Sequence, residues 1–381
     1  YLNNENGERV KVKLIGDCSS LFVDNQEFNE NINDWDVSQV TNMSHMFAKC
    51  RNFNQPLNEW DVSRVTSMEG IFASCEKFNQ PLNNWNVSQV TIMDAMFYNC
   101  EKFNKNINTN IVFDVKGNIK YKTWDVSRVT DMNNMFSLCS NFNQPLNNWD
   151  VSQVTNMRGM FDGCYKFNQP LNNWDVSRVT DMRVMFYKCY KFNKNINTNI
   201  VFDVKGNIKY KTWDVSRVTD MGGMFMDCRK FNQPLNEWDV SRVYNMVEMF
   251  SRCEKFNQPL NNWDVSEVQD MADMFYYCKK FNQPLGNWNV SRVIDMSRMF
   301  NGCKRFNQSL RENIAINENI KDEVINSLPI NISIELIESI ILKFAGEEHG
   351  YKAWDVSNVD YFDEIFEDCG IREENKPLRF R

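Results

Sequence analysis

The sequence of 381 residues is poor in histidine, with only His45 and His349. Multi-histidine metal sites and most histidine-based catalysis are therefore not expected. No run of roughly 18 apolar residues occurs, so no membrane-spanning helix is expected. The chain also lacks an excess of basic charge: its net charge of −7 argues against a general nucleic-acid binder. No Cys-X-X-Cys pair is present, which disfavours zinc.

Tryptophan, in contrast, recurs with a fixed spacing. Most of the 11 tryptophans are 25 residues apart, two steps are 39 residues, and the last is 66. A fixed period of this size is typical of one structural unit stacked many times. The tryptophans are Trp35, Trp60, Trp85, Trp124, Trp149, Trp174, Trp213, Trp238, Trp263, Trp288 and Trp354.

Each tryptophan opens the same motif, W-D-V-S-x-V-T-x-M-x-x-M-F-x-x-C, after a segment F-N-Q-P-L-N-N. A phenylalanine follows 12 residues after each tryptophan and a cysteine 15 residues after it. A longer period is also present, because residues 103–132 and 192–221 are identical. This identity indicates that three units were duplicated together.

The pattern within one unit predicts a short strand followed by a short helix. Trp60 and Val62 point to one side by strand alternation. Val65, Met68, Ile71, Phe72 and Cys75 follow at spacings of 3, 3, 1 and 3, which match one apolar face of a helix. The expected fold is therefore an α/β repeat: a right-handed solenoid of about 12 coils, each with one short parallel strand and one short helix.

The repeat also predicts the organisation of the whole chain. Residues 1–30 contain a degenerate unit and are expected to form an N-terminal capping coil, since solenoids need atypical ends. Residues 31–311 form the repeats, 312–350 an insertion, and 351–381 a last coil with a C-terminal cap.

The recurring motif F-N-Q-P-L-N-N-W-D-V-S-x-V-T-x-M-x-x-M-F-x-x-C resembles the BspA-like leucine-rich repeat. That family occurs in bacterial and mycoplasmal surface proteins, protists and large DNA viruses. The resemblance implies a leucine-rich-repeat solenoid used for adhesion or protein binding, and it implies no catalytic residues. The cysteine position and the richness in Asn, Lys and Ile look most like the viral and protist members.

Two insertions interrupt the regular spacing, at residues 105–122 and 194–211. Each alternates in polarity, turns at a Lys-Gly-Asn segment and alternates again, which predicts a β-hairpin. One interpretation is neutral drift after duplication. The other is a paired contact site.

The third insertion predicts helices. In residues 312–350, Pro329 precedes a helical face that begins at Ile334 and ends before Gly346. The simpler interpretation is a helical hairpin packed on the end of the solenoid. The alternative is an F-box-like element in residues 328–345, which would make the chain a ubiquitin-ligase adaptor.

The 12 cysteines are expected to be free and buried. If they lie on successive helices roughly 8–10 Å apart, they are beyond the roughly 7 Å limit for a disulfide. Free thiols in every coil indicate a reducing compartment, so we expect a cytoplasmic protein, in the host cytoplasm or the virion if it is viral. The family resemblance favours the cell surface as the alternative.

An aspartate follows nine of the tryptophans. We expect these side chains to accept backbone N–H groups of the D-V-S turn, or to pair with the arginine three residues later. The alternatives are an acidic stripe for a basic partner and a calcium site, although a single column lacks the convergent oxygens that calcium prefers. A recurring asparagine, from Asn29 to Asn307, is expected to satisfy backbone groups. A column of basic residues from Lys77 to Arg305 is expected to be solvated rather than to bind a polyanion.

These features predict a non-enzymatic module for protein–protein interaction or adhesion, with no cofactor and no metal. The strand face, the hairpins or both would bind a protein partner of unknown identity. A structural or virion-associated component is a further alternative, and the oligomeric state is open. The candidate partner-binding residues are Phe113, Tyr121, Phe202, Tyr210, Asp61, Asp150, Asp175 and Asp239.

Overall fold

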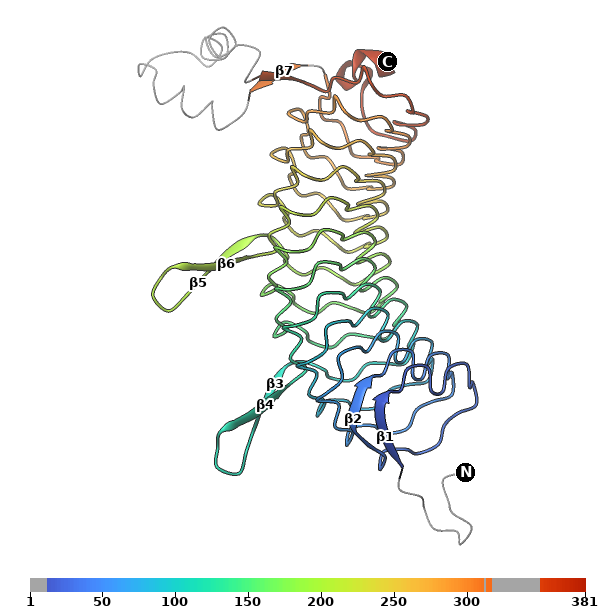
Figure 1. Ribbon diagram of the computed structural model, residues 1–381. Helices are drawn as coiled ribbons and strands as arrows, with labels where there is room; N and C mark the ends of the chain where they lie inside the picture. The colour runs from blue at the N-terminus through green and yellow to red at the C-terminus, as the bar shows by residue number, and fades with distance from the viewer. Residues whose placement is uncertain (1–11, 312, 317–349) are drawn as a thin grey trace.

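The computed structural model describes residues 12–311, 313–316 and 350–381. In these residues the chain winds into coils that stack on one another along a single axis, from the N-terminal end to the C-terminal end (Figure 1). Two hairpins and a third pair of strands project from one side of this stack (Figure 1).

Regular secondary structure is sparse in the described part of the chain. The strands are β1 (Lys13–Asp17), β2 (Asp36–Asn42), β3 (Asn110–Phe113), β4 (Ile119–Thr123), β5 (Asn199–Phe202), β6 (Ile208–Thr212), β7 (Asn313–Ile316) and β8 (Gly350–Ala353). They form four two-stranded sheets, of which β1–β2 is parallel and the other three are antiparallel. Two short 3₁₀ helices, η1 (Glu373–Asn375) and η2 (Leu378–Phe380), lie near the C-terminus.

Neighbouring coils are joined by isolated parallel bridges rather than by continuous strands. Ten such bridges connect equivalent residues of successive coils, beginning with Asn42 to Ser67 and ending with Asp295 to Tyr361. Every bridged residue lies seven positions after a tryptophan. One position per coil therefore sets the register of the whole stack.

The prediction of an α/β repeat with one helix per coil is wrong, because no α-helix occurs in the described residues. The segment between the bridge and the cysteine is instead a series of turns. In one coil, the N–H groups of Met135 and Ser137 donate to the carbonyls of Met132 and Asn134, three residues back. The N–H of Asn134 itself donates to Arg158 of the next coil at 2.8 Å. Alternate N–H groups thus serve the local turn and the neighbouring coil, whereas a helix would bond all of them within itself.

Two residues in every coil have a positive φ, and these residues prevent a helix. They lie 10 and 14 positions after each tryptophan, as at Val184 (φ 48°) and Lys188 (φ 57°). A left-handed residue reverses the chain direction that a right-handed helix would continue. Glycine occupies only some of these positions, so the sequence carries no consistent signal of them.

The core is a set of columns, each made of one residue type that recurs in successive coils. Phe136 has no exposed surface, and its ring lies 5.6 Å from that of Phe97 in the preceding coil and 5.8 Å from that of Phe161 in the next. Some of the buried tryptophans stack in the same way, as Trp213 does on Trp238 at 6.1 Å, and the buried tryptophans are also hydrogen-bonded. The indole Nε1 of Trp174, for example, donates to the carbonyl of Leu146 in the preceding coil at 3.0 Å. Each coil therefore buries its apolar residues only by contacting its neighbours.

Both ends of the stack are covered by departures from the repeat. At the N-terminal end, Phe22 stacks on Phe47 at 5.3 Å, as Phe47 stacks on Phe72 in the next coil. At the C-terminal end, the backbone N–H of Arg372 donates to Asn307, and Arg379 donates to the carbonyl of Val356 at 2.6 Å. The tail thus contacts the last coils through hydrogen bonds.

Candidate partner-binding site

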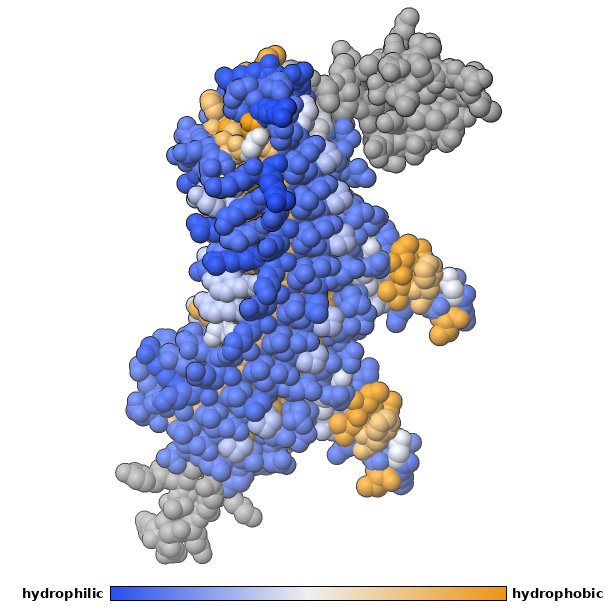
Figure 2. Space-filling view, turned by 180° about the vertical axis from the view of Figure 1, so that it is seen from behind, coloured by the Kyte–Doolittle hydropathy of each residue, from blue (hydrophilic) through white to orange (hydrophobic). Residues whose placement is uncertain are grey.

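The two hairpins are built alike. Strand β3 pairs with β4, with Asn110 opposite Thr123 and Val112 opposite Tyr121. Strand β5 pairs with β6 in the same register, and both hairpins carry a register shift just before their last pair, such as Phe113 opposite Ile119. Antiparallel strands therefore lie where the alternating insertions predicted hairpins. Both project from the same side of the coil stack in two opposite views (Figures 1 and 2).

The tyrosines of the hairpins attach them to the stack. The Tyr121 hydroxyl donates to the backbone carbonyl of Asn84 at 3.3 Å, and the Tyr210 hydroxyl donates to that of Asn173 at 3.1 Å. Partial burial raises the pKa of Tyr210, and the nearby carboxylates of Asp175 and Asp150 add to the shift. These candidate partner-binding tyrosines are half-buried and therefore position the hairpins rather than present a free surface.

The other apolar side chains of the hairpins are exposed. Phe113 is 58% exposed, Ile119 60%, and Val115, at the turn, fully. Figure 2 shows them as two apolar patches, one on each hairpin, beside coils whose visible surface is mostly hydrophilic. We call this set, with Ile111, the apolar hairpin residues; the equivalent residues of the second hairpin are Ile200, Phe202, Val204 and Ile208.

The turn that presents Val115 is fixed by its own hydrogen bonds. The Asp114 carboxylate accepts the backbone N–H groups of Lys116 and Asn118 at 2.8 and 2.9 Å. These bonds, led by that from Asn118, hold the pKa of Asp114 below its usual value. Gly117 has φ +83°, which glycine adopts without strain. Asp203 makes the same bonds in the second hairpin.

The hairpins differ in charge from the rest of the molecule. Each insertion, 105–122 and 194–211, has four lysines and one aspartate, so its net charge is +3, whereas the whole chain has a net charge of −7. The rest of the chain therefore has a net charge of −13, of which residues 312–350 contribute −6. The hairpins combine exposed apolar residues with positive charge, a combination that attracts anionic partners.

A third pair of strands occupies the corresponding place in the last coil. Strand β7 pairs antiparallel with β8, and Ala353 opposite Asn313 directly precedes Trp354. Thr123 opposite Asn110 directly precedes Trp124 in the same way. All three insertions thus leave the coils at one position of the repeat. The expected helices and the F-box-like element lie in residues 317–349, outside the described ranges.

The aspartate that follows tryptophan forms turns, as one of the sequence interpretations expected. Asp61, Asp150, Asp175 and Asp239 each accept the backbone N–H of the serine two residues later, at 3.0–3.1 Å. The expected pairing with arginine is not observed in the described hydrogen bonds, where Arg178 donates to Gln153 of the preceding coil at 2.8 Å. The column has a structural role in every coil.

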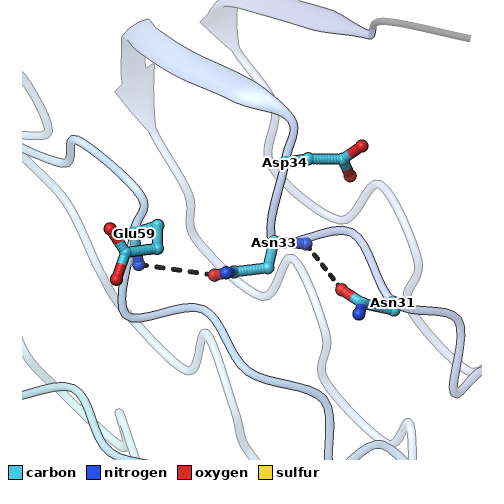
Figure 3. A pocket seen from close by; sticks show the side chains of 4 residues that line it. All are labelled: Asn31, Asn33, Asp34 and Glu59. Atoms are coloured by element: carbon cyan, nitrogen blue, oxygen red, sulfur yellow. Dashed lines mark hydrogen bonds between the residues drawn. The ribbon is translucent and has the colours of Figure 1, made fainter.

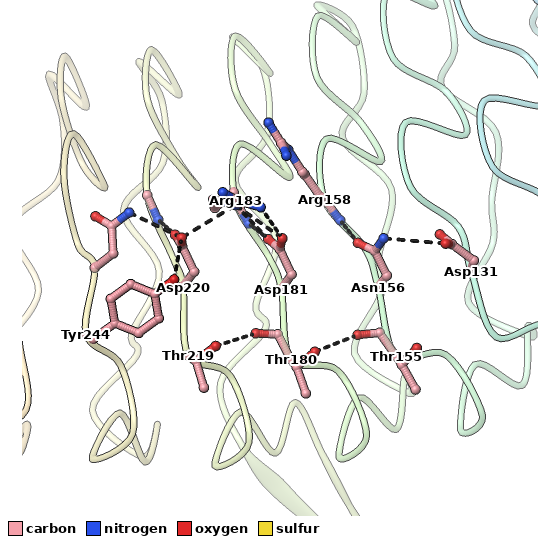
Figure 4. Close-up of polar contacts among 12 residues, drawn as sticks. Asp131, Thr155, Asn156, Arg158, Thr180, Asp181, Arg183, Thr219, Asp220 and Tyr244 are labelled. Atoms are coloured by element: carbon pink, nitrogen blue, oxygen red, sulfur yellow. Dashed lines mark hydrogen bonds and ion pairs between the residues drawn. The ribbon is translucent and has the colours of Figure 1, made fainter.

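Eight of the eleven bridge positions are Asp or Asn and form a further polar column, which the sequence analysis missed. Asp181 accepts two donor groups of Arg183, and the buried Asp220 accepts the side-chain amide of Asn245 at 3.2 Å (Figure 4). The Nε atom of Arg183 also lies 3.5 Å from the Oδ2 atom of Asp220. The recurrent Asp or Asn directly before the first Met of the motif was the available signal.

The twelve cysteines are free, and all but Cys369 are buried. Apart from Cys18, which donates to Ile15, their thiols donate to the phenylalanine carbonyl of the preceding coil, as Cys164 does to Phe136 at 3.1 Å. Burial raises the pKa of Cys50 to about 11. The reason given from sequence is wrong: without helices, stacked coils lie at the strand spacing of about 4.8 Å, within reach of a disulfide. Burial and hydrogen bonding, rather than the distance between coils, are therefore the features that mark these cysteines as free thiols.

No convergent chemical site is found in the part of the chain that the structure describes. No group of three His, Cys, Asp or Glu residues there can hold a metal ion. A shallow pocket is lined by Asn31, Asn33, Asp34 and Glu59 (Figure 3). In it, Asn33 accepts the backbone N–H of Glu59 at 3.3 Å, a contact that Asn58 repeats with Asn84 in the next coil. The described residues also contain no helix with the length and apolarity to cross a membrane.

Comparison with known families gives three consecutive matches to one family, described as Mycoplasma protein of unknown function, DUF285. They cover residues 2–111, 108–210 and 198–313. The chain belongs to the DUF285 family. No curated protein and no solved structure matches it. The family description names Mycoplasma, so the expected viral or protist origin gains no support.

The three DUF285 matches are related to the inserted strands. The first match ends within β3 of the first hairpin, the second within β6 of the second hairpin, and the third within β7. The second and third matches also begin within the two hairpin insertions. The insertions therefore recur at each boundary of the family unit.

Proposed function

We propose that the protein is a non-enzymatic binding module and that its partner docks on the two hairpins. One observation carries this proposal: Phe113 and Val115, with their copies Phe202 and Val204, are exposed together on projecting hairpins, whereas most apolar residues of the coils are buried. Exposed aromatic and aliphatic residues on a projecting element are the usual anchors of an interface. The insertions at the boundaries of the DUF285 unit favour a contact site over neutral drift.

The polar columns support a binding role rather than an enzymatic one. The aspartates after tryptophan accept serine N–H groups, and Asn143 accepts the backbone N–H of Asn168 at 2.9 Å, as its equivalents do in other coils. Side chains engaged in this way at every repeat supply no distinct nucleophile, base or oxyanion donor.

The wider assignments rest on other features. A relation to BspA-like proteins, which would imply adhesion or protein binding, rests on the repeat motif, and the DUF285 match agrees with a tandem repeat family. A reducing compartment rests on the buried thiols. The ubiquitin-ligase alternative depends on residues 328–345, which lie outside the described ranges.

Site-specific photocrosslinking tests the proposed docking surface without knowledge of the partner. A photoreactive phenylalanine analogue at Phe113 and Phe202 is compared with the same analogue at Ile15 and Leu378, two exposed apolar residues outside the hairpins, in β1 and η2. Irradiation of cells that produce the full chain should give adducts mainly from positions 113 and 202. Mass spectrometry then shows whether each adduct is a protein or a lipid.

A shortened chain provides the matched control. Deletion of residues 109–122 and 198–211 removes both hairpins and restores the 25-residue spacing of the tryptophans. This variant should fold and should retain none of the interactions that the hairpin adducts define. Equal labelling from all four positions would overturn the proposal, because it would mean that the hairpins contact nothing specific.

A further inference from the structure

The two hairpins present the same chemistry twice. Their sequences are identical over 105–122 and 194–211, and their exposed residues match, with Phe113 and Phe202 both 58% exposed. Three coils separate them, which places their bases roughly 14–17 Å apart at the spacing of stacked strands and rings. A partner that engages both must either repeat its own epitope at this distance or offer the same surface everywhere.

Charge narrows the partner to an anion. The strands and turn of each hairpin, residues 110–123 and 199–212, hold three lysines and one aspartate, a net charge of +2, on a chain of net charge −7. Lys116 lies in the turn beside the fully exposed Val115, and Lys120 is exposed on β4. A neutral or cationic surface would gain nothing from this arrangement, whereas a surface of negative charge would attract both hairpins at once.

The apolar hairpin residues narrow the partner further. Soluble polyanions, such as nucleic acids and anionic polysaccharides, satisfy the lysines but offer no apolar layer for Phe113, Val115 and Ile119. A lipid surface offers both, because anionic headgroups lie directly above acyl chains. Lysine side chains suit this boundary, since their stems contact apolar groups while the ammonium remains among the headgroups.

The geometry of the hairpins also fits a flat target. Both leave the same side of the stack at the same position of the repeat (Figures 1 and 2). Their turns are held by Asp114 and Asp203, and their stems by Tyr121 and Tyr210. Two projections of equal construction can reach one plane together, and two weak contacts then act as one stronger contact.

We propose that the paired hairpins dock on an anionic lipid surface, with the apolar hairpin residues entering beneath the headgroups and the lysines facing the headgroup phosphates. This inference rests on the proposed function, because it names the partner of the same hairpins. It goes beyond it by replacing the protein partner expected from sequence with a membrane surface.

Vesicle co-sedimentation tests the inference with the full chain. Vesicles of phosphatidylcholine alone are compared with vesicles that also contain a large share of phosphatidylglycerol. The protein should bind the anionic vesicles, and binding should weaken as salt screens the charges. The double variant Val115→Ser and Val204→Ser should lose binding by at least about tenfold, as should the quadruple variant Lys116→Gln, Lys120→Gln, Lys205→Gln and Lys209→Gln.

Matched variants on the coils separate specific docking from general effects. Ile15→Ser with Leu378→Ser removes two exposed apolar residues, and Lys77→Gln with Lys102→Gln removes two exposed charges. Neither should change vesicle binding by more than about twofold. Deletion of one hairpin should weaken binding by more than half, because the paired contact is lost.

Three outcomes overturn the lipid assignment. They are no binding to anionic vesicles, equal binding to neutral and anionic vesicles, and equal binding of anionic vesicles by the wild type and the valine variant, which would indicate general polyanion binding through the lysines alone. The proposed function is tested separately from the lipid assignment. Protein adducts from Phe113 and Phe202 without vesicle binding would retain the docking surface and exclude the lipid.

Discussion

Phe136 in the coils and Phe113 in the first hairpin are the same residue type in opposite environments. Phe136 has no exposed surface and lies between the rings of Phe97 and Phe161, whereas Phe113 is 58% exposed. The coil residue stabilises the fold through neighbours that repeat on both sides. The hairpin residue has no such neighbours, so its apolar surface is available to another molecule. Position in the repeat, rather than residue type, therefore separates stability from recognition.

The largest difference between the two regions should appear in chemical accessibility. Titration of the native protein with a thiol reagent should find few reactive cysteines, and titration after unfolding should find all 12. The reason is burial, which excludes the reagent and raises the pKa of thiols such as Cys50 and Cys369 to about 11. Several disulfides in the intact mass would contradict both the free thiols and the reducing compartment.

The next effect is the loss of a buried ring. Trp174→Ala should lower the free energy of unfolding by about 3–5 kcal/mol, through lost burial and a cavity. Trp174 has no exposed surface and lies 6.2 Å from the ring of Phe161. Denaturant unfolding followed by circular dichroism measures the change. Trp174→Phe is the control: it keeps an aromatic ring but loses the bond to Leu146, so its loss should be smaller.

A polar column position should matter less. Asp175→Ala should cost roughly 0.5–2 kcal/mol, because it removes the acceptor for the Ser177 N–H, which Asp175 holds at 3.0 Å. Asp175→Asn should cost little, since Asn86 accepts the N–H of Ser88 in the same way in another coil. If Asp175→Ala destabilised more than Trp174→Ala in the same unfolding experiment, the column would have a role beyond the turn.

Asp94 should make stability depend on pH. Burial, followed by repulsion from Asp131 and Glu69, raises the pKa of Asp94 to about 6. A carboxyl with a raised pKa binds its proton more tightly in the folded state than in the unfolded state. Its contribution to stability is therefore lost as the pH rises through its folded-state pKa. Stability should therefore increase as pH falls from about 7 toward about 4.

The matched variant isolates this effect. Asp94→Asn should be more stable than the wild type by about 1 kcal/mol at neutral pH and should lose this advantage at low pH. Thermal unfolding at several pH values measures the difference. An unchanged pH profile in Asp94→Asn would assign the dependence to other carboxyls with a raised pKa, such as Asp162.

The smallest effect should be that of the hairpin rings on stability. The double variant Phe113→Ser and Phe202→Ser should change the free energy of unfolding by less than about 0.5 kcal/mol, because neither ring is packed in the core. The same denaturant unfolding experiment measures it. A loss comparable to that of Trp174→Ala would mean that the hairpins are part of the core, and the contrast between the two regions would fail.

The repeat, its core columns and the hairpins could be predicted from sequence, but the backbone of each coil could not. The spacing of Val65, Met68, Ile71 and Cys75 fits one face of a helix, yet it fits equally a series of turns that places the same residues inward. The residues that decide between helix and turns have a left-handed backbone conformation. In one coil these are Val184 and Lys188, and neither residue type has a preference for that conformation.

The candidate site was predicted only in part, and the reason is similar. Alternation located Phe113 and Tyr121 on a hairpin, but it could not show that Tyr121 donates to Asn84 in a coil 37 residues earlier. Val115 was overlooked because it lies in the turn, where no alternating pattern of polar and apolar residues indicates which side chains are exposed. The bridge column was overlooked because Asp181 and Asn156 alternate in type, which conceals a shared position.

The hydrogen bonds between coils run both ways, since turn N–H groups such as that of Asn134 donate to the next coil, but one set donates backwards and matters during synthesis on the ribosome. The indole of Trp174, the thiol of Cys164 and the backbone N–H of Asn168 all donate to atoms of the coil before their own. A coil that emerges during translation therefore meets acceptors that are already in place, about 25 residues back along the chain. Completed coils act as a template for the next one, so the chain can fold vectorially, without waiting for its C-terminus.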